Sequence, residues 1–136
     1  VVDTVFGEAA PRSAQIGGNV DATVDTARQH FRDYFGTVPG YIELLADEAP
    51  RALEGYVLMR EWAIGENPLG RLYTELLWCT VNAADHAQRF VAVHAMGARK
   101  AGATEAQLVE AVVCAIPVAG VAAWLPGADA IIESRA

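Results

Sequence analysis

A chain of 136 residues has the length of one ordinary domain and is long enough to bury a core. Its hydrophobic content of 53%, much of it alanine, suits close helix packing and a buried subunit interface, so we expect an oligomer. The net charge of -7, with only ten Lys and Arg, argues against nucleic-acid or anionic-membrane partners, because both require a basic surface.

The chain begins with a mixed, glycine-containing stretch, and helical patterns follow it. We expect residues 1–18 to form an irregular arm and residues 19–136 to form a single helical domain. Apolar residues recur at helical spacing through most of that domain. The helices predicted from this spacing cover residues 20–35, 41–47, 50–64, 69–83, 86–101 and 105–116, with shorter helical pieces at 121–125 and after Pro126.

Several helix ends carry specific sequence signals. Asp85 with Gln88, and Thr104 with Gln107, have the spacing of capping boxes, in which two side chains satisfy the first backbone N–H groups. Pro117 is predicted to bend or break the helix that contains it. No segment alternates apolar and polar residues as a strand does. The sequence therefore predicts an all-α fold.

The apolar stretches and the cysteines bear on location. The longest apolar stretch, residues 111–125, is interrupted by Pro117 and Gly120, so no membrane-spanning segment is expected. The two isolated cysteines, Cys79 and Cys114, do not suggest a disulfide framework. A reducing cytoplasm is the compartment that this usage predicts.

The predicted hairpin around Ala84 places two reactive side chains at one level. Glu75 lies nine residues before Ala84, and His94 lies ten residues after it. At roughly 1.5 Å of rise per residue, both lie about 14 Å from the turn. Antiparallel helices would therefore bring the carboxylate and the imidazole face to face, and such a pair can transfer protons near neutral pH.

Each of these candidates also has a structural interpretation. A single histidine on an apolar helix face is more often a hydrogen-bonded core residue, and Glu75 could pair with Arg71 one turn before it on the same helix. Cys79, one turn after Glu75, is most simply a small buried hydrophobic residue. Cys114 is expected in the core.

The sequence predicts neither a metal site nor a cofactor. His86 and His94 are eight residues apart, roughly 12 Å along a helix, which is too far to chelate one ion together. There is no HExxH motif, no metal-binding cysteine pair and no glycine-rich phosphate loop. Trp62 and Trp78 either line an apolar pocket or pack in the core, and the second role is the commoner one.

Several short motifs occur in a characteristic order between residues 75 and 111. They are Glu-Leu-Leu at 75–77, Val-Asn-Ala-Ala at 81–84, His94, Ala-Arg-Lys-Ala-Gly-Ala-Thr-Glu at 98–105 and Leu-Val-Glu-Ala at 108–111. This pattern resembles the carboxymuconolactone decarboxylase and alkylhydroperoxidase D-like superfamily. With the lead-in segment from Val38 to Tyr56, the resemblance covers about residues 38–125.

The resemblance implies an all-helical domain that assembles as a homotrimer or homohexamer, with active sites near the subunit contacts. In the peroxidase branch of the superfamily, a Glu, a CxxC pair and a His relay protons to a redox thiol. The Glu corresponds to Glu75 and the His to His94, whereas the two cysteine positions are occupied by Ala87 and Phe90. Without those thiols, thiol–disulfide peroxidase chemistry cannot run there.

The decarboxylase branch lacks the cysteine pair and resembles this sequence better. It acts on a small carboxylated lactone through acid–base chemistry, which would make Glu75 and His94 the proton acceptor and donor. The basic residue that commonly precedes the family Glu is Thr74 here. Arginine suits bidentate binding of a substrate carboxylate. The candidates for this role are Arg60, Arg71 and Arg89.

Three functional hypotheses follow. The first is a cofactor-independent, lyase-type enzyme that uses Glu75 and His94 on a small organic acid or lactone, by decarboxylation, hydration or isomerisation. The second is a non-catalytic binding or assembly protein on the same scaffold, which the absence of both cysteines and the presence of Thr74 favour. The third is a thiol peroxidase that uses Cys79 alone.

Overall fold

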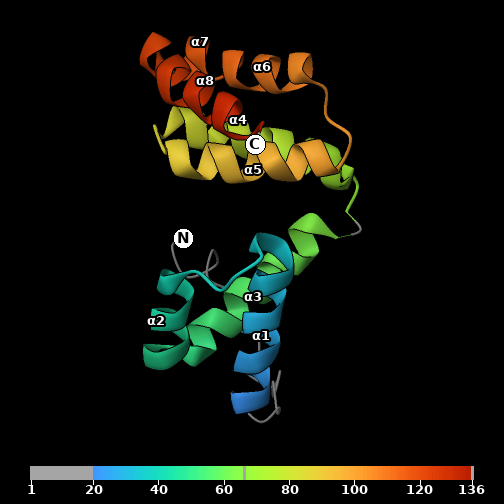
Figure 1. Cartoon of the computed structure of the whole chain (residues 1–136), viewed down its shortest axis with the longest axis vertical. Coiled ribbons are helices and arrows are strands. Elements are labelled where there is room, and N and C mark those ends of the chain that lie inside the picture. The colour runs from blue at the N-terminus through green and yellow to red at the C-terminus, as the bar shows by residue number, and fades with distance from the viewer. Residues whose placement is uncertain (1–19, 66, 136) are drawn as a thin grey trace, which may run out of the picture. The chain divides into compact units, whose positions relative to one another are not determined.

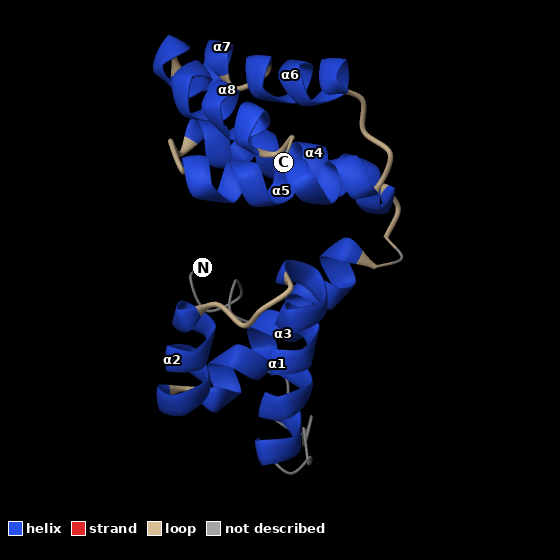
Figure 2. Cartoon of the chain, viewed as in Figure 1, coloured by secondary structure: helices blue, strands red, loops and turns tan. Residues whose placement is uncertain are grey.

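The computed structural model describes residues 20–65 and 67–135, and these consist of helices and connecting loops (Figures 1 and 2). No strand occurs in these two ranges, so the all-α prediction is confirmed. The arm predicted over residues 1–18 lies outside the described residues. Among the helices that the structure describes, none combines the length and hydropathy needed to cross a bilayer.

The chain divides into two compact units between Val57 and Leu58. A single domain over residues 19–136 stays a prediction. The first unit contains α1 (Val20–Phe35), α2 (Gly40–Glu48) and the beginning of α3 (Pro50–Ile64).

An apolar core holds the first unit together. Phe31 of α1 is fully buried and stacks against Phe35 and Tyr56, with ring centroids 5.9 and 5.8 Å away. Phe31 and Phe35 lie on one face because α1 directs residues spaced four apart to the same side, and Tyr56 reaches the cluster from α3. Gly36 ends α1 with a φ of 81°, a left-handed conformation that glycine adopts without steric cost.

The second unit is built around a helical hairpin. The elements after the end of α3 are α4 (Gly70–Ala84), α5 (Gln88–Lys100), α6 (Glu105–Val113), α7 (Ile116–Ala119), a 3₁₀ turn (Val121–Ala123) and α8 (Trp124–Glu133). The short connection makes α4 and α5 antiparallel neighbours. Helix α6 packs on α4 and α8 packs on α5, so the later helices cover one side of the hairpin (Figure 1).

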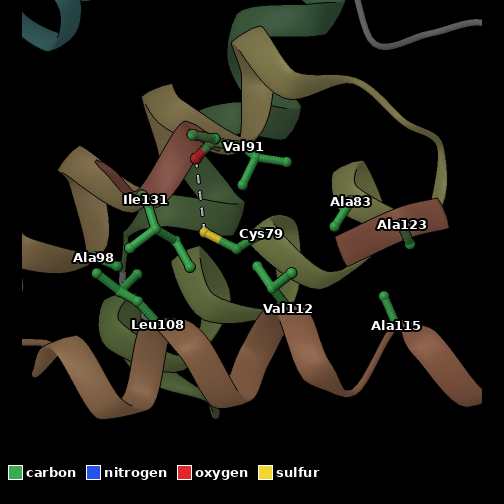
Figure 3. Packing of buried hydrophobic residues seen from close by; sticks show 11 residues of the cluster. Cys79, Ala83, Val91, Ala98, Leu108, Val112, Ala115, Ala123 and Ile131 are labelled. Carbon is green, nitrogen blue, oxygen red and sulfur yellow. Dashed lines mark hydrogen bonds between the residues drawn. The ribbon is translucent and has the colours of Figure 1, made fainter. Parts of the chain in front are cut away.

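The core of the second unit combines small and branched side chains. Cys79 points among Val91, Leu108, Val112 and Ile131 (Figure 3). Six buried alanines complete the cluster, namely Ala83, Ala95, Ala98, Ala115, Ala123 and Ala130. Such small side chains let the helix backbones approach closely, which explains the alanine-rich composition.

The capping signals had different outcomes. Thr104 and Gln107 form the predicted capping box at the start of α6, with Gln107 N donating to Thr104 Oγ1 over 3.2 Å. The box predicted at Asp85 and Gln88 is wrong. Asp85 instead follows the last turn of α4, because His86 adopts a positive φ of 57° and delays the start of the next helix to Gln88.

The C-terminal helix also differs from the prediction. The sequence suggested two helical pieces separated at Pro126, but α8 runs without a break from Trp124 to Glu133. Pro126 lies in its first turn, where the missing N–H of proline has no intrahelical partner to lose. The predicted break near Pro117 does occur, between α6 and α7.

Candidate active site

Glu75 and His94 face each other across the α4–α5 hairpin. His94 Nδ1 lies 3.0 Å from Glu75 Oε2, within hydrogen-bond distance. The Glu75 side chain is fully buried, and the His94 side chain retains 9% exposure. The juxtaposition predicted from the spacing around Ala84 is therefore present.

The contact determines how the imidazole is presented. Because Nδ1 faces the Glu75 carboxylate, Nε2 is the ring nitrogen left to meet a substrate or solvent. A carboxylate that receives the Nδ1–H fixes both the tautomer and the orientation of a histidine. The arrangement can accept or donate a proton at Nε2 while Glu75 stabilises the positive charge on the ring.

Gly97 makes room for the Glu75 carboxylate. It lies on α5 three residues after His94, and both residues are buried. A Cβ atom at Gly97 would stand 2.5 Å from Glu75 Oε1 and 2.7 Å from Oε2. The carboxylate therefore rests directly against the α5 backbone. We did not single out Gly97 from the sequence, although a glycine inside a predicted helix, one turn after the candidate histidine, was an available signal.

Arg71 contacts the other oxygen of the same carboxylate. Its Nε lies 3.5 Å from Glu75 Oε1, and its side chain is 42% exposed. Glu75 thus meets a partly exposed cation on one side and the imidazole on the other, which compensates the loss of water around a buried charge. Glu75 therefore pairs with Arg71, as the structural interpretation proposed, and also contacts His94.

Trp78 connects His94 with the end of α3. Its ring centroid lies 4.7 Å from that of His94, with the planes tilted by 57°. The guanidinium carbon of Arg60, a buried residue, lies 5.8 Å from the Trp78 ring, within cation–π range. Trp78 therefore contacts both Arg60 and His94.

A cavity of about 420 Å³ adjoins Trp78. Its walls include Trp62 and Trp78, the two tryptophans considered as pocket-lining residues from the sequence. Leu77 and Thr74 also line it, and Thr74 directly precedes Glu75. Trp62 is 70% exposed, so it lines the cavity rather than packing in the core. The sequence alone was consistent with both roles for these tryptophans.

The remaining candidates, Arg89 and Cys79, are remote from the pair or unreactive. Arg89 is exposed near the start of α5, and no ion pair with the described residues involves it. Cys79 is fully buried, and its Sγ is 3.9 Å from the Val91 carbonyl oxygen that accepts its hydrogen bond (Figure 3). Burial, with a further contribution from the negative charge of Glu75, raises the pKa of the Cys79 thiol to about 12. The thiol therefore stays protonated at neutral pH, which does not favour peroxidase chemistry.

The prediction for Cys114 is wrong, because this residue is exposed. It follows the last residue of α6, where the chain turns, and Ala115 takes the buried position beside it. Within the part of the chain that the structure describes, no group of three His, Cys, Asp or Glu residues could hold a metal ion.

Comparisons with known proteins bear on the family and the fold. Residues 50–133, more than half of the chain, match the model of the carboxymuconolactone decarboxylase family. No curated protein matches the chain. A crystal structure from Burkholderia xenovorans LB400, of a protein provisionally named a carboxymuconolactone decarboxylase, is similar with a TM-score of 0.76. It is 22% identical, and the match covers 86% of this chain and 92% of that one, which shows a shared fold. The chain thus belongs to the carboxymuconolactone decarboxylase family.

Proposed function

We propose that this protein is an acid–base enzyme in which Glu75 and His94 move a proton on a small organic acid or lactone. The observation that carries the proposal is the 3.0 Å contact between a fully buried carboxylate and an imidazole that keeps limited exposure. An ionisable pair enclosed between two helices is typical of a functional site, because such a pair contributes little to stability relative to apolar packing.

The two residues have separate roles in this proposal. Glu75, enclosed between α4 and α5, orients the imidazole, and His94 exchanges the proton with the substrate at Nε2. Decarboxylation leaves an electron pair on carbon that must be protonated, whereas hydration and isomerisation remove one proton and return another. A positioned histidine serves each of these lyase-type steps.

Arg71 is the candidate for binding a substrate carboxylate. It combines an ion pair to Glu75 with a side chain that remains 42% exposed, so an incoming anion can reach it. Arg60 is buried against Trp78, and Arg89 is remote from the pair. Arg71 would therefore hold a carboxylate near the imidazole.

A non-catalytic assembly role is the second candidate, and one surface favours it. Tyr73, Leu77 and Val81 are spaced four residues apart on α4 and are 59%, 49% and 62% exposed. This apolar stripe supports assembly of several copies of the chain, which both functions would use. The family resemblance makes a homotrimer or homohexamer the proposed form. The two functions differ in whether the Glu75–His94 pair turns over a substrate.

A screen of small carboxylic acids and lactones tests the enzyme proposal. Each compound is incubated with the native protein, with His94→Gln and with Arg89→Gln, and product is measured by mass spectrometry. The proposal expects turnover of at least one compound by the native protein and the Arg89→Gln control but not by His94→Gln. Turnover that survives in His94→Gln would contradict it, and so would a complete absence of turnover.

A further inference from the structure

The cavity beside Trp78 has the size and lining of a binding site for a small molecule. Its volume of about 420 Å³ lies within the range of roughly 300–1,000 Å³ that is usual for ligand pockets. Trp62, Trp78, Leu69 and Leu77 supply much of its wall. Three of these four side chains, those of Trp62, Leu69 and Leu77, are about half exposed or more, so a bound molecule would cover apolar surface that now faces solvent.

The amide of Asn67, which lines the cavity, is already fully used by the protein. Its Nδ2 donates to the Ala63 carbonyl over 2.6 Å and to Thr74 Oγ1 over 3.3 Å. Its Oδ1 accepts hydrogen bonds from the backbone N–H groups of Leu69 and Gly70. Asn67 therefore organises the loop before α4 and offers little to a ligand.

Thr74 is occupied in the same way. Its hydroxyl donates to the Gly70 carbonyl over 3.1 Å and accepts from Asn67. Among the described residues that line the cavity, none carries a charge. The Arg60 guanidinium lies 5.8 Å from the Trp78 ring but does not line the cavity. An ionised group placed inside would lose its hydration without gaining a charged partner in the lining, which is unfavourable.

The two indoles favour a flat ring. Tryptophan faces provide a large apolar area and stack well on planar groups. The Trp78 ring also contacts the His94 ring at a centroid distance of 4.7 Å. A ring bound against Trp78 would therefore lie one aromatic layer from the imidazole.

We propose that this cavity binds an uncharged, planar ring compound, such as a neutral lactone or an aromatic ring, through apolar contact with Trp62 and Trp78. The inference goes beyond the proposed function: neither His94 nor Glu75 lines the cavity, so binding of the ring is separate from proton transfer at His94. A carboxylate on the ring is expected to weaken binding, because no described residue of the lining compensates the loss of its hydration.

Two matched probes test this preference. Coumarin is a planar neutral lactone, and coumarin-3-carboxylate adds one negative charge to the same ring system. Isothermal titration calorimetry with the full chain at pH 7 should give a dissociation constant about tenfold lower for coumarin than for its carboxylate. Equal binding of the two probes, tighter binding of the carboxylate, or no coumarin binding at all would overturn the proposal.

A pair of variants on one helix locates the binding. Trp62 lines the cavity, whereas Met59 does not, and the two residues are 70% and 68% exposed on α3. We expect Trp62→Ala to weaken coumarin binding about tenfold and Met59→Ala to change it by less than about twofold. An unchanged affinity in Trp62→Ala would contradict the assignment.

Failure of this inference is distinguishable from failure of the proposed function. Binding is measured without turnover and depends on Trp62, whereas turnover is measured by product formation and depends on His94. If a second copy of the chain covers Trp62, coumarin finds no site and the binding proposal fails, while the turnover experiment still reports on the Glu75–His94 pair.

Discussion

The two ends of the α4–α5 interface are built by the same helices but differ in chemistry. Near the turn between the helices, Cys79, Ala83 and Val91 are fully buried in an apolar cluster. One helical turn before Cys79 on α4, the interface holds Glu75 against His94 and Gly97. A hairpin that packs well with apolar residues at one end does not need an ionisable pair at the other.

The buried groups at the two ends differ in the partners that surround them. Around Cys79, burial raises the pKa of the thiol to about 12 and keeps it neutral. Around Glu75, Arg71 and His94 supply partners on both carboxylate oxygens. The first end follows the ordinary rule for a core, and the second is the departure from that rule which marks a candidate site.

Removing the carboxylate charge should have the largest effect. Glu75→Gln keeps the size and shape of the side chain but cannot stabilise a charged imidazole. We expect turnover to fall about 100-fold or more, because His94 loses the group that orients it and a general acid–base group contributes about that much. Steady-state kinetics on the substrate found in the screen measures the loss, and circular dichroism checks the fold. Native turnover in a folded Glu75→Gln would remove Glu75 from the mechanism.

Displacing the carboxylate without changing its chemistry should have the next largest effect. In Gly97→Ala the added Cβ would stand 2.5–2.7 Å from the Glu75 carboxylate, so that group must move. We expect a loss of about 1–3 kcal/mol in the free energy of unfolding. We also expect about 100-fold lower turnover, because misplacement by roughly 1 Å can cost that much.

A control for this substitution lies on α3. Gly55 is an exposed helical glycine, and a Cβ there would meet nothing within 4 Å. Gly55→Ala should therefore stabilise the protein by about 0.5–1 kcal/mol and leave turnover unchanged. Urea denaturation measures both variants. Equal stability and equal turnover in the two variants would show that the Glu75 carboxylate does not depend on the missing side chain of Gly97.

The same kind of substitution at an apolar contact should affect stability alone. Gly127 of α8 packs against Val112 of α6, and an added Cβ would clash with the Val112 side chain. Gly127→Ala should cost about 1–3 kcal/mol of stability through overpacking. Turnover at a temperature where the variant is folded should match the native value. A selective loss of turnover would mean that the apolar cluster also controls the chemistry.

The smallest effect concerns the thiols. With a pKa of about 12, only about one Cys79 in 10,000 is a thiolate at pH 8. A disulfide reagent should therefore modify the exposed Cys114 and leave Cys79 unmodified in the native protein. Rapid modification of both cysteines without unfolding would contradict the buried environment of Cys79.

The raised pKa of Cys79 also predicts a pH dependence of stability. The folded state holds the Cys79 proton more tightly than the unfolded state, whose thiol has an ordinary pKa of 9.0. Its contribution is fully present below pH 9 and declines as the pH rises toward 12. Denaturant titrations at a series of pH values give the free energy of unfolding of the native protein and of Cys79→Ala. Plotted against pH, the two free energies should follow parallel lines below pH 9 and diverge above it. Parallel lines above pH 9 would argue against the raised pKa.

Much of the fold could be predicted because helix formation here follows local pattern. The apolar spacing from Val20 to Phe35 gave the bounds of α1, and Thr104 with Gln107 marked the start of α6. The capping box at Asp85 failed because His86 takes a positive φ, which residue type alone rarely signals. Cys114 was misassigned because hydrophobicity alone does not show on which side of a turn a residue lies.

The site divides in the same way. Equal distances of Glu75 and His94 from the hairpin turn were enough to predict that they face each other. Gly97 and the cavity were not predicted, because both depend on packing in three dimensions. The contact between Gly97 and the Glu75 carboxylate exists only when α4 lies against α5. The cavity depends on hydrogen bonds that Asn67 makes with residues before and after Asn67 in the chain.

A double-mutant cycle on Glu75 and His94 tests the central claim most directly. Turnover is measured for the native protein, Glu75→Gln, His94→Gln and the double variant. If the two residues act as one unit, each single variant loses most of the activity, and the double variant is within about twofold of the slower single variant. If the two losses multiply independently, or if either single variant retains native turnover, then Glu75 and His94 do not form one catalytic pair.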